Sequence, residues 1–516
     1  VAQATTISAA TNSGTKAIAA LTDTAAAIAA STNTVLNIVT GVVTASTDAT
    51  GAQATALAAF TKAVVYNVND TVANVVAAAG PGLNEAVNVV ATGTANVAQA
   101  TTIEAATNTG TTSVGALSDT AAAIAGSSNA VLGIVTGTVT ATTDATGAQA
   151  NALSAFTKPV VYSVTDTVAG VLSAVGGGLN DAVNVTTTGV ATTAQANTIM
   201  AATNTGATTI ANVTDTAANA AGLAAGANDT ILALVVTDTA NVAQATFWQT
   251  NSHITSTSIA SLTDTAANLA GSTNAVMNQV TGTITASTQA TGAQAIVIGG
   301  FTHAVVYSVT DTAAGVASAA GAGLNEAVNI TATGIATVAN ATTIFNATNS
   351  GTKTIAALTD SAANIAGSSN GVLDLVTGAI IANTNATGAQ SNTLSAFNHP
   401  IVYSVSDTAA NLVAAYGSGN GLNDAVDVTS TGVANSAQAN TIMTATNSGT
   451  TTITNVTDTA GNAATLAPGS NDVILALVVT NTANIAQATS WVNNAQITST
   501  TINSIADTAG AIAGTT

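Results

Sequence analysis

Eleven aspartates return along the chain in one short phrase, T-D-T-A-A or a close variant, and regularly spaced carboxylates are potential metal ligands. The repeat aspartates are Asp23, Asp70, Asp119, Asp166, Asp215, Asp264, Asp311, Asp360, Asp407, Asp458 and Asp507. Consecutive members lie 47, 49, 47, 49, 49, 47, 49, 47, 51 and 49 residues apart. Because Ca²⁺ takes carboxylate oxygens as ligands, a stacked row of these residues is a candidate calcium site.

A structural role is the alternative for the repeat aspartates, and it is the one we expect. Each lies just before an Ala-rich segment, where an Asp or Thr side chain accepts the free N–H groups of a helix start. Such a cap is worth about 1 kcal/mol, which offsets a repulsion of roughly 1 kcal/mol between neighbouring carboxylates in water. The G-G-x-G-x-D nonapeptide of calcium β-helices is missing. We therefore expect helix caps and no cofactor, with Ca²⁺ as the open alternative.

Aromatic and cationic residues form a second recurrent set, which we call the contact stripe. Four times the chain places an aromatic, two residues later a Lys or His, and then a Tyr. Two tryptophans occupy equivalent places 243 residues apart. The stripe comprises Phe60, Lys62, Tyr66, Phe156, Lys158, Tyr162, Phe301, His303, Tyr307, Phe397, His399, Tyr403, Trp248 and Trp491. We expect it to mark contacts between subunits or between coils, and a ligand-binding stripe is the alternative.

Residues for catalysis are not arranged in any recognisable pattern. The three histidines lie far apart and lack metal-ligand spacing, and cysteine is absent. No Ser/His/Asp set or phosphate loop stands out, so we expect that the protein is not an enzyme. A recurrent A-Q-A phrase supplies a set of amides, which we expect to stack as a ladder, with a sugar-binding face as the alternative. These amides are Gln53, Gln99, Gln149, Gln195, Gln244, Gln294, Asn340, Gln390, Gln438 and Gln487.

The elements that position these residues follow from the residue pattern around each aspartate. Five residues before it, every repeat has Ile or Val, which favours a short strand that ends at the aspartate. After it, apolar residues recur at helical spacing for barely two turns, too short to be stable alone. A second strand-like run and the A-Q-A segment complete the unit. Each unit of about 48 residues therefore consists of two strand-plus-turn halves of about 24.

The order of loop lengths reveals a larger period. The loops between each aspartate and the next marker Asn are of three types, which we call A, B and C. They follow the order A-B-A-B-C twice and then begin again. A fixed period of this kind is typical of stacked repeats. We predict a β-rich repeat protein, an elongated parallel β-solenoid with short helical turns and about 48 residues per repeat. Residues 1–516 would form one continuous solenoid, with superrepeats at 1–241 and 242–484 and the start of a third at 485–516. One coil could hold 48 or 24 residues, giving a rod of ~50 Å or twice that length.

Composition excludes several classes of function. Only 5% of the residues are charged, against roughly 25% in ordinary soluble domains, and four lysines are the only basic residues besides histidine. With a net charge of −19, no cationic surface exists to bind nucleic acid or anionic lipid. Apolar residues make up 47%, enough for a core, but polar residues interrupt every apolar run before the ~18 residues that span a bilayer. We expect no membrane insertion.

The phrases Thr263-Asp264-Thr265-Ala266-Ala267-Asn268-Leu269-Ala270 and Asp360-Ser361-Ala362-Ala363-Asn364-Ile365-Ala366 resemble the D-T-A-A-N-I repeat of very large secreted bacterial surface proteins. The acidic, Cys-free composition rich in Thr, Ala, Asn and Gly is also similar to that of Gram-negative surface-layer and adhesin proteins. The resemblance covers all eleven repeats through short motifs. It implies an exported, non-catalytic protein that is extracellular or lies on the cell surface.

Both ends of the sequence fall within a repeat, and neither carries a polar cap of the kind that closes a solenoid. We therefore expect either a longer chain or end-to-end stacking, both of which give a filament. The predicted function is structural, a filament or surface layer built by self-association, end to end or laterally. The alternative is a surface adhesin, or a glycan-binding or ice-binding module on one face. Thr44 with Thr47, and Thr138 with Thr140 and Thr142, are the residues that hint at ice binding.

Overall fold

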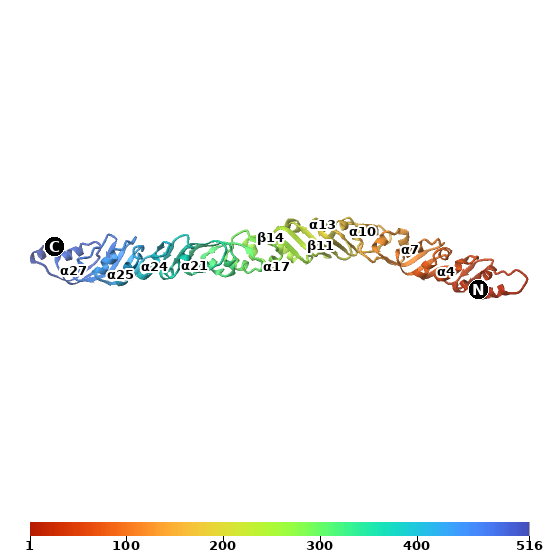
Figure 1. Ribbon diagram of the computed structural model, residues 1–516, viewed down its shortest axis with the longest axis horizontal. Coiled ribbons are helices and arrows are strands. Elements are labelled where there is room, and N and C mark those ends of the chain that lie inside the picture. The colour runs from red at the N-terminus through yellow and green to blue at the C-terminus, as the bar shows by residue number, and fades with distance from the viewer. Residues whose placement is uncertain (515–516) are drawn as a thin grey trace. The chain divides into compact units, whose positions relative to one another are not determined.

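The computed structural model describes residues 1–514 and divides the chain into two compact units, Val1–Ala260 and the residues from Ser261 onward. In each unit short strands alternate with short helices, and the order along the unit follows the order in the sequence (Figure 1). We call each strand-plus-helix segment a pass of the chain. The chain is β-rich, with parallel sheets and many short helices.

The first unit contains the elements from α1 to β13 and α15. Its strands are β1 (Leu21–Asp23), β2 (Val43–Ala45), β3 (Val64–Val65), β4 (Val68–Thr71), β5 (Val89–Ala95), β6 (Thr112–Asp119), β7 (Val139–Ala141), β8 (Val160–Val161), β9 (Val164–Thr167), β10 (Val185–Ala191), β11 (Thr208–Asp215), β12 (Asp229–Ile231) and β13 (Leu234–Ala240). Its helices are α1 (Ala2–Ala9), α2 (Ala25–Ala29), α3 (Asn33–Leu36), α4 (Gly51–Ala58), α5 (Val72–Ala77), α6 (Pro81–Asn84), α7 (Val97–Glu104), α8 (Ala121–Ala125), α9 (Asn129–Gly133), α10 (Gly147–Ser154), α11 (Val168–Leu172), α12 (Gly177–Asn180), α13 (Thr193–Met200), α14 (Ala217–Ala220) and α15 (Val242–Thr250).

The boundary between the units falls within β14 (Thr257–Asp264). The later strands are β15 (Ile284–Ala286), β16 (Val305–Val306), β17 (Val309–Thr312), β18 (Ile330–Ala336), β19 (Lys353–Asp360), β20 (Ile380–Ala382), β21 (Ile401–Val402), β22 (Val405–Thr408), β23 (Val428–Ala434), β24 (Thr451–Asp458), β25 (Asp472–Ile474), β26 (Leu477–Ala483) and β27 (Thr500–Ile505). The later helices are α16 (Ala266–Ala270), α17 (Asn274–Met277), α18 (Gly292–Ile298), α19 (Ala313–Ser318), α20 (Ala322–Asn325), α21 (Val338–Phe345), α22 (Ala362–Ala366), α23 (Asn370–Leu373), α24 (Gly388–Ser395), α25 (Ala409–Ser418), α26 (Ser436–Met443), α27 (Ala460–Ala463), α28 (Ile485–Val492) and α29 (Ala509–Ala513).

Most strands pair in parallel with a strand of the next pass, and the step between paired residues is slightly less than half a repeat. Leu21 pairs with Val43 and Val43 with Val64, whereas Val89 pairs with Thr112. The same steps recur in the second unit, where Leu262 pairs with Ile284 and Ile284 with Val305. Each parallel pair therefore joins one pass of the chain to the next.

The sheets are short because the pairing step and the sequence period differ. Two pairing steps lead from Leu21 to Val64, which lies 43 residues further along the chain. Val68, the residue of the next repeat that is equivalent in sequence to Leu21, lies 47 residues after Leu21. The ladder β1-β2-β3 therefore ends at Val64–Val65, and β4 starts a new ladder, β4-β5-β6-β7-β8, three residues later. Sequence-equivalent residues do not pair with one another.

The core lies between the strands and the helices of successive passes. Val43, Val68 and Val89 point inward from the strands and are fully buried, as are Ile28 and Leu57 on the helices. Because successive strand side chains point to opposite faces, the strand residues that alternate with these buried residues face solvent. These outward residues are mainly Thr and Val, which suit an extended backbone and carry no charge.

Four glycines with positive φ lie at bulges in the strands that follow the longer loops. Gly93, Gly189, Gly334 and Gly432 have φ values of 95°, 86°, 74° and 75°. At these places the pairing register shifts, for example between Ala91 and Thr94. Only glycine adopts this backbone region without strain, which explains the T-G-x phrase of these strands.

No helix within residues 1–514 is long and apolar enough to cross a membrane.

Candidate functional site: the repeat aspartates and the contacts between passes

Each repeat aspartate lies within two residues of the end of a strand and accepts a hydrogen bond from the residue that follows it. In Asp70, Oδ1 accepts the backbone N–H of Thr71 at 2.7 Å. The same bond recurs at all eleven positions, with N–O distances of 2.7 to 2.9 Å. The carboxylate thus fixes the turn from strand to helix.

The second oxygen of the carboxylate binds the preceding pass of the chain. Oδ2 of Asp70 accepts the backbone N–H of Gly51, the first residue of α4, at 3.0 Å. Equivalent bonds of 2.9 to 3.0 Å join Val97 to Asp119, Gly147 to Asp166, Thr193 to Asp215, Gly292 to Asp311, Val338 to Asp360, Gly388 to Asp407, Ser436 to Asp458 and Ile485 to Asp507. Each of these aspartates therefore satisfies an orphan N–H at the start of a neighbouring helix.

The helix start next to each aspartate is capped by a different residue. The N-cap is the Thr or Ser at the following position, and its hydroxyl accepts the N–H three residues later in every repeat except at Thr71. From the sequence, either the Asp or the Thr was expected to cap this helix. The structure divides the two roles, because the threonine caps its own helix and the aspartate binds one in the preceding pass.

An asparagine four residues after the aspartate adds a third bond in six repeats. Nδ2 of Asn74 donates to Oδ1 of Asp70 at 3.0 Å. Asn219, Asn268, Asn364, Asn411 and Asn462 donate to their own aspartates at 2.7 to 2.8 Å. This explains the Asn of the D-T-A-A-N phrase, which lies one helical turn after the carboxylate.

In Asp70 and Asp360 these hydrogen bonds favour the charged form of the carboxylate. The pKa of Asp70 lies below its ordinary value of 3.8 because of the amide of Asn74 and the N–H groups of Gly51 and Thr71. Partial burial acts against the shift in Asp360, but Asn364, Val338 and Ser361 donate enough to lower its pKa as well. Both carboxylates are therefore ionised at neutral pH.

The repeat aspartates do not gather into a metal-binding cluster in residues 1–514. No group of three or more His, Asp or Glu side chains in this part of the chain could hold a metal ion. A cation bound at Asp70 would have to compete with three N–H donors. What the arrangement does chemically is to accept N–H groups from two successive passes.

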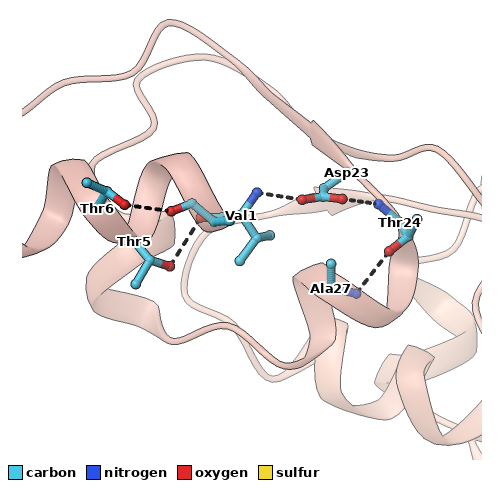
Figure 2. Close-up of polar contacts among 7 residues, drawn as sticks. Val1, Thr5, Thr6, Asp23, Thr24 and Ala27 are labelled. Carbon is cyan, nitrogen blue, oxygen red and sulfur yellow. Dashed lines mark hydrogen bonds and ion pairs between the residues drawn. The ribbon is translucent and has the colours of Figure 1, made fainter.

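The first repeat aspartate has a different donor. The terminal ammonium of Val1 lies 2.6 Å from Oδ2 of Asp23, while Oδ1 accepts the N–H of Thr24 (Figure 2). Thr24 in turn accepts the N–H of Ala27 at 3.2 Å. Val1 precedes Ala2-Gln3-Ala4 as Gly51 precedes Ala52-Gln53-Ala54, so an ammonium takes the place of a peptide N–H.

The tyrosines and tryptophans of the contact stripe are internal. Tyr66, Tyr162, Tyr307 and Tyr403 are each 2% exposed, and their hydroxyls donate to the carbonyls of Gly82, Gly178, Gly323 and Gly421 in the next pass. Burial raises the pKa of Tyr162 and of Tyr307 to about 12, and Asp181 and Glu326 add to the effect. Nε1 of Trp248 donates to Ala220, and Nε1 of Trp491 to Ala463. These residues make contacts between passes.

The remaining residues of the stripe are partly buried. Lys158 Nζ donates to the Thr136 carbonyl at 3.5 Å, and His303 Nε2 lies 2.9 Å from the Gly282 carbonyl oxygen. Lys62 and His399 occupy the equivalent places. Phe60, Phe156, Phe301 and Phe397 are neither buried nor fully exposed. Lys158 and His303 thus reach back to the preceding pass.

The Gln residues of the A-Q-A phrase close capping boxes. Oε1 of Gln53 accepts the N–H of Thr50 at 3.0 Å, and the hydroxyl of Thr50 accepts the N–H of Gln53. The same box recurs at the other Gln positions and at Asn340. The prediction of an amide ladder is therefore wrong for these side chains. The motif Thr-x-x-Gln before an apolar run is a known signal for this cap.

Sequence reasoning also missed two buried carboxylates, Asp229 and Asp472, which lie 243 residues apart. Each accepts the N–H of a glycine three residues earlier, Gly226 or Gly469. Burial raises the pKa of Asp472. The shared phrase G-x-N-D in the C-type loops was the available signal.

No protein-family model and no curated protein matches the chain. Among solved structures it is similar to the plant peptide hormone receptor RGFR1 in complex with RGF2. That comparison has 8% sequence identity and a TM-score of 0.14, and covers 92% of this chain and 80% of the receptor chain. Such a TM-score does not establish a shared fold, so the function has to be argued from the chain itself.

Proposed function

We propose that the protein is a structural β-solenoid that forms an extracellular filament or a cell-surface layer. The observation that carries the proposal is the recurrent step between paired strands, slightly less than half a repeat in both units. A chain that pairs each pass with the next can extend by adding passes, and each pass contacts only its neighbours. The repeat aspartates and the stripe tyrosines bind neighbouring passes as well.

The same step supports a coil of about half a repeat, so that each repeat contains two coils. A coil of one full repeat would pair residues that lie a full repeat apart, and the observed partners are less than half of that distance apart in sequence. With strands ~4.8 Å apart, each repeat would then advance the stack by roughly 10 Å.

Surface chemistry supports an extracellular place and self-association. The strands present neutral Thr and Val side chains outward, so two copies can approach each other with little charge repulsion between these faces. Zero cysteines and very few charges fit the resemblance to secreted surface-layer and adhesin proteins. The partner we propose is another copy of the same chain, stacked end to end or laterally.

Electron microscopy and fibre diffraction of the purified chain test this function. We expect uniform filaments or ordered sheets, with a meridional reflection at about 4.8 Å from the stacked strands. The matched control is a variant with Lys in place of outward valines, Val65→Lys and Val161→Lys, which places charges on the outer face. Monodisperse particles at all concentrations, with no filament or layer, would rule the proposal out.

Ice binding is a second candidate, favoured by one row of hydroxyls. Thr165, Thr186, Thr209 and Thr230 pair side by side in β9, β10, β11 and β12 and are partly exposed. Such a row places methyl and hydroxyl groups at a regular spacing of ~4.8 Å, which could order water. Inhibition of ice recrystallisation by the wild type, lost in Thr186→Lys with Thr209→Lys, would support it. Equal ice growth with and without protein would exclude it.

A further inference from the structure

A groove beside Tyr162 is built from three successive passes of the chain. It has a volume of about 380 Å³, within the size range of small-molecule sites. Phe156, Pro159 and Tyr162 line it from the segment after α10, Asn180 and Asp181 from the end of α12, and Thr205 from the turn before β11. The groove therefore exists only when the passes are stacked.

The same residue types recur at three other places in the chain. The aromatic ring, the Asn–acid pair and the hydroxyl all return in the same order and at closely similar spacing. The four sets are Phe60, Asn84, Glu85 and Thr109; Phe156, Asn180, Asp181 and Thr205; Phe301, Asn325, Glu326 and Ser350; and Phe397, Asn423, Asp424 and Ser448. The acid alternates between Glu and Asp, and the hydroxyl residue is Thr in the first two sets and Ser in the last two, so the chemistry is kept where the residue changes.

The acids of these sets differ from the repeat aspartates in having no structural partner. Within residues 1–514, the side-chain carboxylates of Glu85, Asp181, Glu326 and Asp424 accept no hydrogen bond and form no ion pair, and all four are exposed. By contrast, the repeat aspartates each hold at least one backbone N–H of the fold. Four unpaired carboxylates at one repeated place in an already acidic chain are not explained by folding.

The other polar groups of the groove are also available to a ligand. Oδ1 of Asn180 accepts the N–H of Thr203 at 3.0 Å, which leaves its NH₂ group as a free donor. The hydroxyl of Thr205 makes no hydrogen bond within the described part of the chain. The Tyr162 hydroxyl is used by Gly178, so the tyrosine serves as a fixed part of the wall.

We propose that the groove beside Tyr162, and the equivalent place at each of the other three sets, binds one or two residues of a neutral saccharide. The apolar C–H face of a sugar ring packs on an aromatic ring. A carboxylate accepts hydrogen bonds from two neighbouring sugar hydroxyls, and hydrogen bonds to a charged acceptor are strong. The amide and the hydroxyl complete a polar set suited to a ligand rich in hydroxyl groups. A chain with a net charge of −19 would repel an anionic ligand.

Repetition of the groove favours a polymeric ligand. The carboxylates Glu85 and Asp181 belong to the first unit, and Glu326 and Asp424 belong to the second. Each unit therefore carries two of these residue sets, and binding at one raises the effective concentration of a polysaccharide at the other. The binding function goes beyond the structural role proposed above, since a filament could form without it.

Affinity electrophoresis of the full chain tests this inference. Native gels would contain a soluble neutral polysaccharide, namely galactomannan, arabinoxylan, hydroxyethyl cellulose, laminarin or dextran, and mobility would be compared with a gel without polymer. We expect at least one of these polymers to retard the wild type. In the variant Glu85→Gln, Asp181→Asn, Glu326→Gln, Asp424→Asn, affinity should fall about tenfold or more, since a bond to a charged acceptor is lost in each groove.

Two controls separate the groove from general effects. The variant Glu104→Gln with Asp374→Asn changes acids that, within residues 1–514, also accept no hydrogen bond but lie outside the four sets, and it should bind as the wild type does. Replacement of Phe60, Phe156, Phe301 and Phe397 by Leu keeps the charge and should weaken binding if rings stack on the sugar. Far-UV circular dichroism confirms folding of each variant.

The inference is overturned if none of the five polymers retards the wild type. It is also overturned if the four-acid variant is retarded as strongly as the wild type, or if the Glu104 and Asp374 control loses binding equally. Electron microscopy of the same variants keeps the two proposals apart, because filament formation should not depend on the groove acids.

Discussion

Val1 and Gly51 occupy equivalent places at the start of a helix, yet the surroundings of the two residues differ. The nitrogen of each is held by Oδ2 of a repeat aspartate, Asp23 or Asp70. Valine fits at the first place, whereas a Cβ at Gly51 would lie 2.0 Å from the carbonyl oxygen of Asn74. Gly147, Gly292 and Gly388 meet similar contacts with the next pass, at 1.9, 1.9 and 2.9 Å.

The comparison separates two properties of the contact between passes. The hydrogen bond to the aspartate is made wherever a nitrogen reaches the carboxylate, whether it is an ammonium or a peptide N–H. The residue type at that nitrogen instead depends on how closely the backbone of the next pass approaches. Glycine is required there by a close approach, because the φ values of these four glycines are not positive.

Gly51→Ala should have the largest effect. Alanine normally favours a helix over glycine, but here its methyl group would overlap a backbone carbonyl that cannot rotate away. We expect a loss of about 3 kcal/mol in the free energy of unfolding, at the upper end of overpacking effects. Urea unfolding followed by circular dichroism measures it. Gly133→Ala is the control, since a Cβ there meets nothing within 4 Å, and it should be neutral or slightly stabilising. An unchanged midpoint for Gly51→Ala would contradict the close approach.

Removal of the carboxylate should have the next largest effect. Asp70→Ala leaves the N–H groups of Gly51 and Thr71 and the amide of Asn74 without their acceptor. We expect a loss of about 1–2 kcal/mol, because the site is partly open to water, which replaces some of these bonds. Asp23→Ala should shift the urea midpoint less, since water readily solvates its ammonium partner. A larger shift for Asp23→Ala than for Asp70→Ala would reverse the comparison.

Acid should weaken the contacts that involve charged carboxylates. The folded-state pKa values of Asp70, Asp215 and Asp407 are lowered, so their contribution is present above the unfolded value near 3.8 and is lost as the pH falls below it. We expect the urea midpoint to be constant from about pH 7 to pH 5 and to fall between about pH 4 and pH 2. The variant Asp70→Asn should show a shallower fall. A midpoint that rises on acidification would show that the charge repulsion among these acids outweighs their hydrogen bonds.

Acetylation of the Val1 nitrogen should have the smallest effect. It replaces an ammonium by an amide N–H, which is the kind of donor that Gly51 presents to Asp70. We expect a small downward shift of the thermal midpoint at low salt, which disappears at about 0.5 M NaCl because the ion pair is screened. The acetylated and free forms can be compared by differential scanning calorimetry. A shift that is independent of salt would mean that hydrogen bonding, not charge, stabilises this place.

Much of the architecture is predicted by local residue patterns. Ile or Val five residues before each aspartate indicates a strand, and the Thr after it indicates a helix start. In the first ten repeats the structure has strands that end at the aspartate or one residue beyond, in the last the strand ends two residues before Asp507, and helices follow within two residues. The roles of the site residues were harder to predict. The roles of Asp and Thr were not separated, the Gln capping box was missed, and the tyrosines were not recognised as buried donors to the next pass.

The sequence by itself determined the repeat period, the alternation of strand and short helix, and the lack of positive charge. These are local or compositional properties, readable from neighbouring residues. Only the tertiary structure decided that strands pair across slightly less than half a repeat, that Asp70 binds Gly51, and that Gly51 has no room for a side chain. Such contacts depend on which residues meet when passes stack. Which residues meet is set by the total length of chain, loops included, between the two passes.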